Sequence, residues 1–108
     1  MHSSIKVIIP AYNEADSIGL VIAAIPDIVE EVIVVSNNST DATEANAAAA
    51  GATVLQENRK GYGYACLKGM QYISEQSKKP DIIIFLDGPS HKNLSDESLS
   101  IFISIIFE

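Results

Sequence analysis

The stretch that decides the fold is residues 5–14, which read Ile5-Lys6-Val7-Ile8-Ile9-Pro10-Ala11-Tyr12-Asn13-Glu14. The β-branched first half predicts a buried strand, which Pro10 ends because proline has no N–H for the sheet. A helix is expected next: Asn13 would cap it, and Glu14 and Asp16 would lie in its first turn, where negative charge complements the helix dipole. An apolar stripe at helical spacing follows, and its members are Ile18, Val21, Ile22 and Ile25. A strand followed directly by a helix is the repeating unit of α/β proteins.

The same unit recurs along the chain. Further strands are expected at residues 32–35, 53–56 and 82–86. Helices are expected from Asp41 to Ala50, with Glu44 completing an acidic variant of the capping box, and from the loop at 57–62 through about residue 76. Apolar strands that alternate with helices indicate parallel strands covered on both faces. The predicted fold class is α/β, an open, mainly parallel sheet with helices on both faces, in a single domain over residues 1–108.

The C-terminal segment allows two interpretations. Ser95 could cap a helix that runs to Ile106, whereas Ile101, Ile103 and Ile105 alternate as in a strand. We favour the helix. Either structure leaves more apolar surface than a small sheet absorbs, which predicts a longer chain, a second copy or another partner at this segment.

The composition limits the function classes. The 108 residues are 47% hydrophobic and carry a net charge of −7, which fits one compact domain but not the phosphate-neutralising surface of a nucleic-acid-binding protein. Cys66 is the single cysteine, so no internal disulfide forms, and a cytoplasmic location is expected. Residues 99–107 fall far short of the roughly 20 apolar residues that cross a bilayer. No transmembrane segment is therefore expected, and attachment to a membrane surface stays open.

Polar residues collect where the predicted strands end. They occur in four segments, residues 10–14, 36–40, 58–63 and 87–89. In an open parallel sheet, ligands bind beyond the carboxyl ends of the strands, where the strand order reverses. Four loops are therefore expected to line one crevice.

Four blocks of sequence carry a resemblance to a known family. They are Val7-Ile8-Ile9-Pro10-Ala11-Tyr12-Asn13-Glu14, Val34-Val35-Ser36-Asn37-Asn38-Ser39-Thr40-Asp41-Ala42-Thr43, Asn58-Arg59-Lys60-Gly61-Tyr62-Gly63 and Ile84-Phe85-Leu86-Asp87-Gly88. In order and spacing they resemble the nucleotide-sugar-binding half of the GT-A glycosyltransferases of family 2. The resemblance implies strand order 3-2-1-4, a nucleotide-diphosphate sugar as ligand, Mg²⁺ or Mn²⁺ as cofactor, and a truncated catalytic domain.

The resemblance also implies which residues of the first two blocks bind the donor. Pro10, Ala11, Tyr12 and Glu14 would line the nucleoside pocket, with the Tyr12 ring stacking on the base. The alternative is that this block only starts a helix, and both can hold. Ser36 and Asn37 stand where the family commonly has acidic residues. Asn37 can still offer a carbonyl oxygen to the base, although ordinary turn chemistry explains the run Asn37-Asn38-Ser39 equally well.

In the last two blocks, backbone N–H groups of Gly61 and Gly63 would approach the donor phosphates, with Lys60 or Arg59 adding positive charge, and Asp87 and Gly88 would lie beside them. A flexible loop with solvated cations is the alternative for Lys60. Asp87 is the expected metal ligand, but Pro89 replaces the second acidic residue of the family's pair, so metal binding through Asp87 alone would be weak. We do not expect His91 or Asp96 to replace that acidic residue as a metal ligand. A lone histidine in a polar loop is usually solvated, and Asp96 is more simply a residue at the start of a helix.

Two other function classes remain open. The loss of the acidic pair favours a catalytically inactive nucleotide-binding or assembly module. A nucleotidyltransferase is weaker, because a glycine-rich basic signature does not follow the first strand. The neighbouring Glu30 and Glu31 are interpreted as a solvated edge rather than an acid/base pair.

Overall fold

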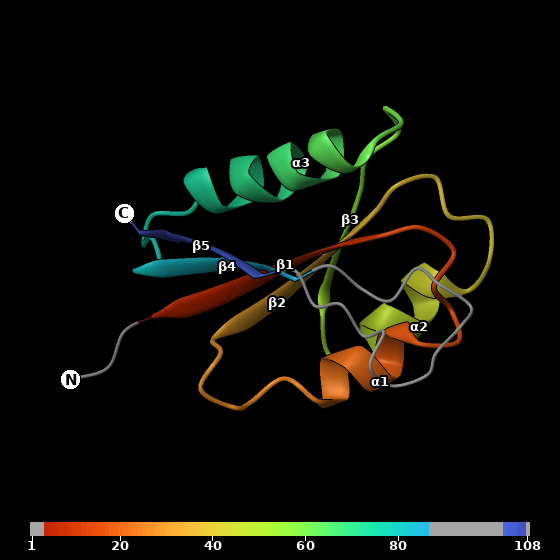
Figure 1. Ribbon diagram of the computed structural model, residues 1–108, viewed down its shortest axis with the longest axis horizontal. Coiled ribbons are helices and arrows are strands. Elements are labelled where there is room, and N and C mark those ends of the chain that lie inside the picture. Colours follow the sequence, from red (N-terminus) through yellow and green to blue (C-terminus); the bar gives the residue numbers. More distant parts are fainter. Residues whose placement is uncertain (1–3, 87–102, 108) are drawn as a thin grey trace.

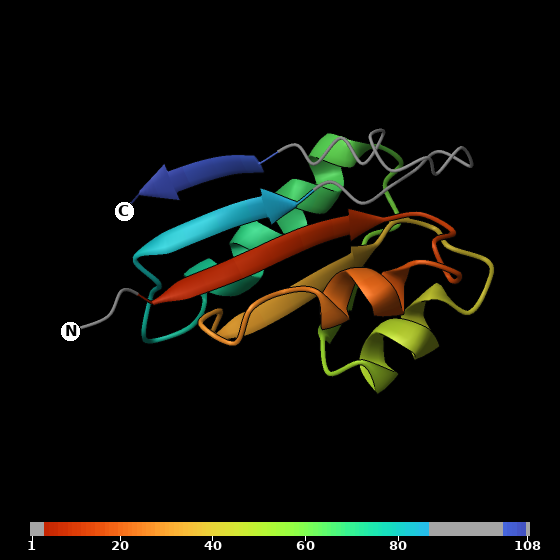
Figure 2. The same cartoon turned by 60° about the horizontal axis from the view of Figure 1, so that its bottom comes forward.

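The computed structural model describes residues 4–86 and the strand at 103–107. Its elements, in chain order, are β1 (Ile5–Ala11), α1 (Ile18–Ala23), β2 (Glu31–Ser36), α2 (Thr43–Ala49), β3 (Thr53–Gln56), α3 (Tyr62–Ser74), β4 (Ile82–Leu86) and β5 (Ile103–Phe107). The sheet order is β3-β2-β1-β4-β5. The first four strands in this order are parallel, and β5 runs antiparallel to β4 (Figure 2). The expected order 3-2-1-4 is confirmed.

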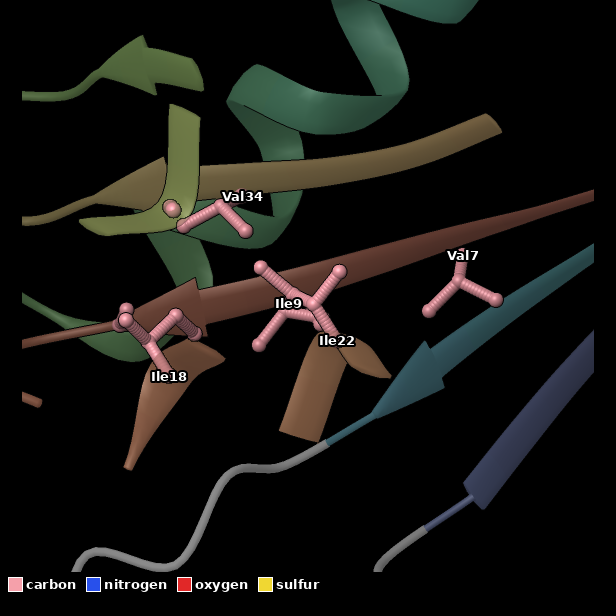
Figure 3. Close-up of a cluster of buried hydrophobic side chains, with 7 residues drawn as sticks. Val7, Ile9, Ile18, Ile22 and Val34 are labelled. Atoms are coloured by element: carbon pink, nitrogen blue, oxygen red, sulfur yellow. The ribbon is translucent and has the colours of Figure 1, made fainter. Parts of the chain in front are cut away.

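Helices cover both faces of the sheet, as expected. Figure 1 shows α3 on one side of the strands and α1 with α2 on the other. Each face of the sheet has its own hydrophobic core. Alternate residues of a strand lie in one core or the other, because successive side chains point to opposite faces. On the α1/α2 face, Ile18 and Ile22 of α1 lie against strand residues that include Val7, Ile9 and Val34 (Figure 3). On the other face, Ile8, Ile33 and Val35 lie under α3.

The first two helices begin later than the sequence suggested. Asn13 has a φ of 50°, which is outside the helical region, and its side-chain oxygen accepts a bond from the Thr40 backbone N–H at 2.8 Å. A turn follows, and α1 starts only at Ile18. Tertiary contact with the next loop thus replaces the expected cap. Likewise α2 starts at Thr43 rather than Asp41, and the Glu44 side chain accepts a bond from the Gln56 side chain instead of completing a capping box.

The favoured helix at the C-terminal segment is wrong for residues 103–107, which form β5; residues 87–102 lie outside the described part. The pairs Ile84↔Ile105 and Leu86↔Ile103 place β5 along the outer edge of β4. An uncovered β4 would leave a row of unpaired backbone N–H and C=O groups at the sheet edge. Pairing between distant segments therefore decides a pattern that local periodicity left ambiguous.

Glu31 is not the solvated residue that the sequence suggested. Its carboxylate accepts bonds of 2.7 Å from the Lys6 ammonium, the Thr53 hydroxyl and the Tyr72 hydroxyl. The Lys6 ammonium also donates to the Gln76 side chain at 2.7 Å. Burial raises the pKa of Glu31, but these hydrogen bonds outweigh it and hold the pKa below its usual value. This cluster joins β1, β2 and β3 to α3 at the amino-terminal ends of the strands, opposite the polar loops.

No helix in the described part of the chain is long and apolar enough to span a membrane.

Candidate functional site

The loops that follow β1, β2 and β3 leave the sheet at the same edge. Ser36 pairs in register with Ala11 of β1 and with Gln56 of β3, so these three strands end level with one another. In Figure 1 the loops after β1 and β2 lie at the right-hand end, and the loop after β3 lies above them beside the start of α3; all three are away from the labelled chain termini. We call the loops at these carboxyl ends of the strands the rim; it is made up of residues 12–17, 37–42 and 57–61. The predicted convergence of these three loops is therefore what the structure shows.

The first two rim loops are joined by hydrogen bonds. The backbone N–H of Asn13 donates to the Ser39 hydroxyl at 3.0 Å, and that of Glu14 donates to the Thr43 hydroxyl at 2.7 Å. Asp41 accepts from the backbone N–H of Ala15 at 3.3 Å and also from the Thr43 hydroxyl. The bond from the Thr43 hydroxyl is the main cause that lowers the pKa of Asp41. These contacts fix the backbone of the Tyr12 loop.

The second and third rim loops are joined through one side chain. The Asn37 amide nitrogen donates to the backbone oxygens of Glu57 at 2.9 Å and Arg59 at 2.7 Å. Its side-chain oxygen accepts from the backbone N–H of Gly61 at 3.0 Å. Both N–H groups of the carboxamide are therefore used within the protein, and the side chain is half-buried.

The buried side chain of Glu57 holds the third rim loop, residues 57–61, in place. Its buried carboxylate accepts from the Arg59 backbone N–H at 2.8 Å and from the Arg59 guanidinium at 3.0 and 3.1 Å. The guanidinium also lies 4.4 Å from the ring centroid of Tyr64. Arg59 is therefore occupied by contacts with Glu57 of its own loop and with Tyr64 of α3. Lys60 is exposed, and among the described residues no carboxylate pairs with it.

The contacts of Glu57 predict a pH dependence of stability. Hydrogen bonds from the Arg59 side chain, then from its backbone N–H, lower the pKa of Glu57 from 4.5 to about 2. Because the folded pKa is depressed, this contribution is complete above the unfolded pKa near 4.5 and is lost as the pH falls toward 2. In urea titrations from pH 7 to pH 2, the stability difference between wild type and Glu57→Gln should be largest at neutral pH and shrink below pH 4.5. Parallel curves for the two proteins would contradict this account.

The predicted donor-binding residues divide into exposed and buried groups. Tyr12, at 61% exposure, and Lys60 present their side chains at the rim, and the exposed Gly61 has a φ of 127° that favours glycine. Pro10 and Ala11 are buried at the end of β1, so they support the rim. Glu14 is half-buried, with its carboxylate accepting a bond from the Ser17 hydroxyl at 3.2 Å. Asp87 and Gly88 lie outside the described residues.

Ser36 is 1% exposed, and its hydroxyl has no hydrogen-bond partner among the described residues. A buried hydroxyl without a partner destabilises the folded state by about 1–3 kcal/mol. Ser36→Ala should therefore raise the melting temperature of the ligand-free chain, or leave it unchanged. A loss of stability above about 1 kcal/mol in Ser36→Ala would show that the hydroxyl has a partner in solution. Thr43→Ala, which removes the hydrogen bonds of a fully buried hydroxyl with the Glu14 N–H and the Asp41 carboxylate, is the control expected to lose stability.

Sequence reasoning missed the residues that hold the rim together. Asn13, Ser39 and Thr43 connect the first two loops, and Glu57 anchors the third. The sequence offers little signal for these roles, because polar residues between a strand and a helix are common turn formers.

The described residues contain no group of three histidine, cysteine or acidic side chains placed to hold a metal ion.

The open sheet with order 3-2-1-4 and the polar loops at its carboxyl edge define a GT-A-type α/β domain. Residues 6–90 match the family described as glycosyl transferase family 2, and the chain belongs to that family. It is 45% identical over 67 residues to an uncharacterized glycosyltransferase of Mycobacterium tuberculosis, a match that covers 62% of this chain and 30% of that protein. It is also 35% identical over 96 residues to the glucosyl-3-phosphoglycerate synthase of Mycolicibacterium paratuberculosis, covering 78% of this chain and 28% of that enzyme.

Solved structures agree with these sequence matches. A crystal structure of glucosyl-3-phosphoglycerate synthase from Mycobacterium tuberculosis, in complex with Mn²⁺, UDP and glucosyl-3-phosphoglycerate, matches with a TM-score of 0.67 and 34% identity. The match covers 79% of this chain and 33% of that one. Other structures of the same synthase contain UDP-glucose with Mn²⁺, or UDP with Mg²⁺. This chain therefore spans about a third of the length of these relatives.

Proposed function

We propose that this chain binds a nucleotide-diphosphate sugar at its rim, as the donor-binding part of a glycosyltransferase. The observation that carries the proposal is the continuous rim, in which the side chains of Asn13 and Asn37 hydrogen-bond to neighbouring loops and so join all three, while Tyr12 and Lys60 stay exposed. Family membership and the UDP and UDP-glucose complexes of the similar synthase support it. UDP is therefore the nucleotide that we test first.

Each exposed rim residue has a role suited to its chemistry. The ring of Tyr12 offers a flat apolar surface on which a base can stack. Lys60 comes two residues before Tyr62, the first residue of α3, whose amino terminus carries partial positive charge, so the two together favour the donor's diphosphate. Such local charge matters in a chain with a net charge of −7. Arg59 is a poorer candidate because Glu57 already neutralises it.

A divalent cation would offset the negative charge of the diphosphate. The synthase structures contain Mn²⁺ or Mg²⁺, and in this chain Asp87 remains the proposed ligand. The described residues do not form a site for the ion by themselves, so the roles of Tyr12 and Lys60 are derived without it. The cytoplasmic location and an interaction of the C-terminal segment with a second copy or another partner remain predictions.

Calorimetric titration of the 108-residue chain with UDP, UDP-glucose and GDP, with and without MnCl₂, tests the proposal. We expect UDP and UDP-glucose to bind. Tyr12→Ala should weaken UDP binding by about tenfold, because base stacking on an aromatic side chain contributes about 1–3 kcal/mol. Tyr12→Phe keeps the ring and should bind nearly as the wild type does. The absence of binding by every nucleotide under both conditions would refute the proposed function.

The role of Lys60 has its own matched control. Lys60→Ala should weaken UDP binding by about fivefold, the effect of about 1 kcal/mol expected from a charge-assisted contact. Lys78 is also exposed but lies with Lys6 and Gln76 at the opposite edge of the sheet, so Lys78→Ala should leave the affinity unchanged. Equal losses from the two substitutions would indicate a general charge effect and contradict a rim contact.

A further inference from the structure

We infer that Asn37 is a positioning residue, whose carboxamide sets the path of residues 57–61 and thereby places Lys60 for the donor's phosphates. The inference rests on the proposed function and assigns a part of the site that contacts no ligand itself. It differs from the sequence-based expectation that the Asn37 oxygen meets the base.

The hydrogen bonds of Asn37 fix the orientation of its carboxamide. Its nitrogen faces two backbone oxygens, those of Glu57 and Arg59, and its oxygen faces the Gly61 N–H. Exchanging nitrogen and oxygen would set the side-chain oxygen against two carbonyl oxygens and the amide group against an N–H. The partners therefore allow one orientation, and in it no N–H of the side chain is left for a base.

A carboxylate cannot replace the Asn37 amide in these contacts. An aspartate at position 37 could still accept from the Gly61 N–H, but its second oxygen would face the carbonyl oxygens of Glu57 and Arg59 without a proton to donate. The path of residues 57–61 in this chain thus depends on an asparagine.

The anchored groups stand on both sides of Lys60. Arg59 is held through its backbone oxygen by Asn37 and through its N–H by Glu57, while Gly61 is held through its N–H. Lys60 itself extends into solvent between them. Fixing the two neighbouring residues limits the positions that the Lys60 ammonium can reach, which lowers the entropy lost when it binds an anion.

The first test needs no ligand. Trypsin cleaves after Arg59 and Lys60 in the anchored loop, and after Lys78 at the opposite end of the sheet; Lys79 precedes Pro80 and is not cleaved. In Asn37→Ala and Asn37→Asp, cleavage after Arg59 and Lys60 should be about tenfold faster than in the wild type, because the loop opens more often. Cleavage after Lys78 should not change, which shows that the variants remain folded.

Asn38 provides the matched control. Its amide donates to the Asn58 backbone oxygen at 3.1 Å, a single contact with the same loop, and its φ is 66°. Asn38→Gly removes that contact and keeps the backbone conformation accessible. It should change trypsin cleavage much less than Asn37→Ala does. Equal cleavage rates in the wild type and both Asn37 variants would overturn the inference.

The second test separates positioning from a direct base contact. Calorimetric titrations with UDP and with inorganic pyrophosphate should show that Asn37→Ala weakens both ligands by the same factor, because the effect acts on phosphate binding. Lys60→Ala should cost little further affinity in the Asn37→Ala background, since the two residues act as a unit. Loss of UDP affinity alone, with pyrophosphate binding unchanged, would overturn the inference and support a base contact.

Failure of the proposed function gives a different result. If the wild-type chain binds neither UDP nor pyrophosphate, the proposed function and the phosphate role of Lys60 both fail. The trypsin rates still test whether Asn37 holds residues 57–61 in place. Faster cleavage in the Asn37 variants would support that role, and unchanged rates would overturn it.

Discussion

Glu31→Ala should lower the free energy of unfolding by about 3 kcal/mol, because it leaves the buried ammonium of Lys6 without its counter-charge. The Lys6 side chain is 9% exposed and that of Glu31 is 20% exposed, so water replaces the lost carboxylate only in part. The substitution also removes the acceptor of the Thr53 and Tyr72 hydroxyls. Three strands and α3 lose a shared contact in one change.

Urea denaturation of two further variants checks this result. Glu30 is exposed and its carboxylate accepts from the Ser4 hydroxyl, so Glu30→Ala should change stability by only about 0.5 kcal/mol. The double variant Lys6→Met with Glu31→Leu leaves no buried charge, and it should recover most of the loss. If Glu30→Ala and Glu31→Ala cost the same, the cluster would not have the structural role assigned to it.

Gly69→Ala and Gly63→Ala should change stability in opposite directions although both lie in α3. A Cβ at Gly69 would lie 2.8 Å from Ile8 Cγ2 and 3.0 Å from Ile8 Cδ1, and Ile8 is fully buried in β1. Overpacking of this kind costs about 1–3 kcal/mol. A Cβ at Gly63 meets nothing within 4 Å, so alanine there should gain about 0.5–1 kcal/mol from helix propensity.

Melting curves of the two alanine variants test the close approach of α3 to β1. Truncation of Ile8, the residue that the added Cβ would contact, gives a sharper check. Ile8→Ala removes the three Ile8 atoms nearest the added Cβ, so Gly69→Ala should destabilise the Ile8→Ala background much less than the wild type. Additive losses would mean that the steric contact is not the cause.

Sequence patterning predicted much of the fold because it depends on local chemistry. The apolar runs at residues 5–9 and 82–86 are strands, although Pro10 lies inside β1 rather than ending it, and the alternation of strands with helices predicted a parallel sheet. The rim also followed from the sequence, since polar residues after parallel strands must meet at one edge. Asp87, the expected metal ligand, stays a prediction.

The remaining features depend on contacts between residues far apart in the chain. The sequence determined by itself that residues 5–86 alternate strand and helix and that Tyr12, Asn37 and Lys60 follow successive strands. Only the tertiary structure decided that Ile103–Phe107 pairs with β4 as a strand, that Glu31 is bonded to Lys6, and that the Asn37 carboxamide faces residues 57–61. The physical reason is that a polar side chain or a strand edge is satisfied by whichever distant partner the fold brings to it, and local periodicity carries no information about that partner.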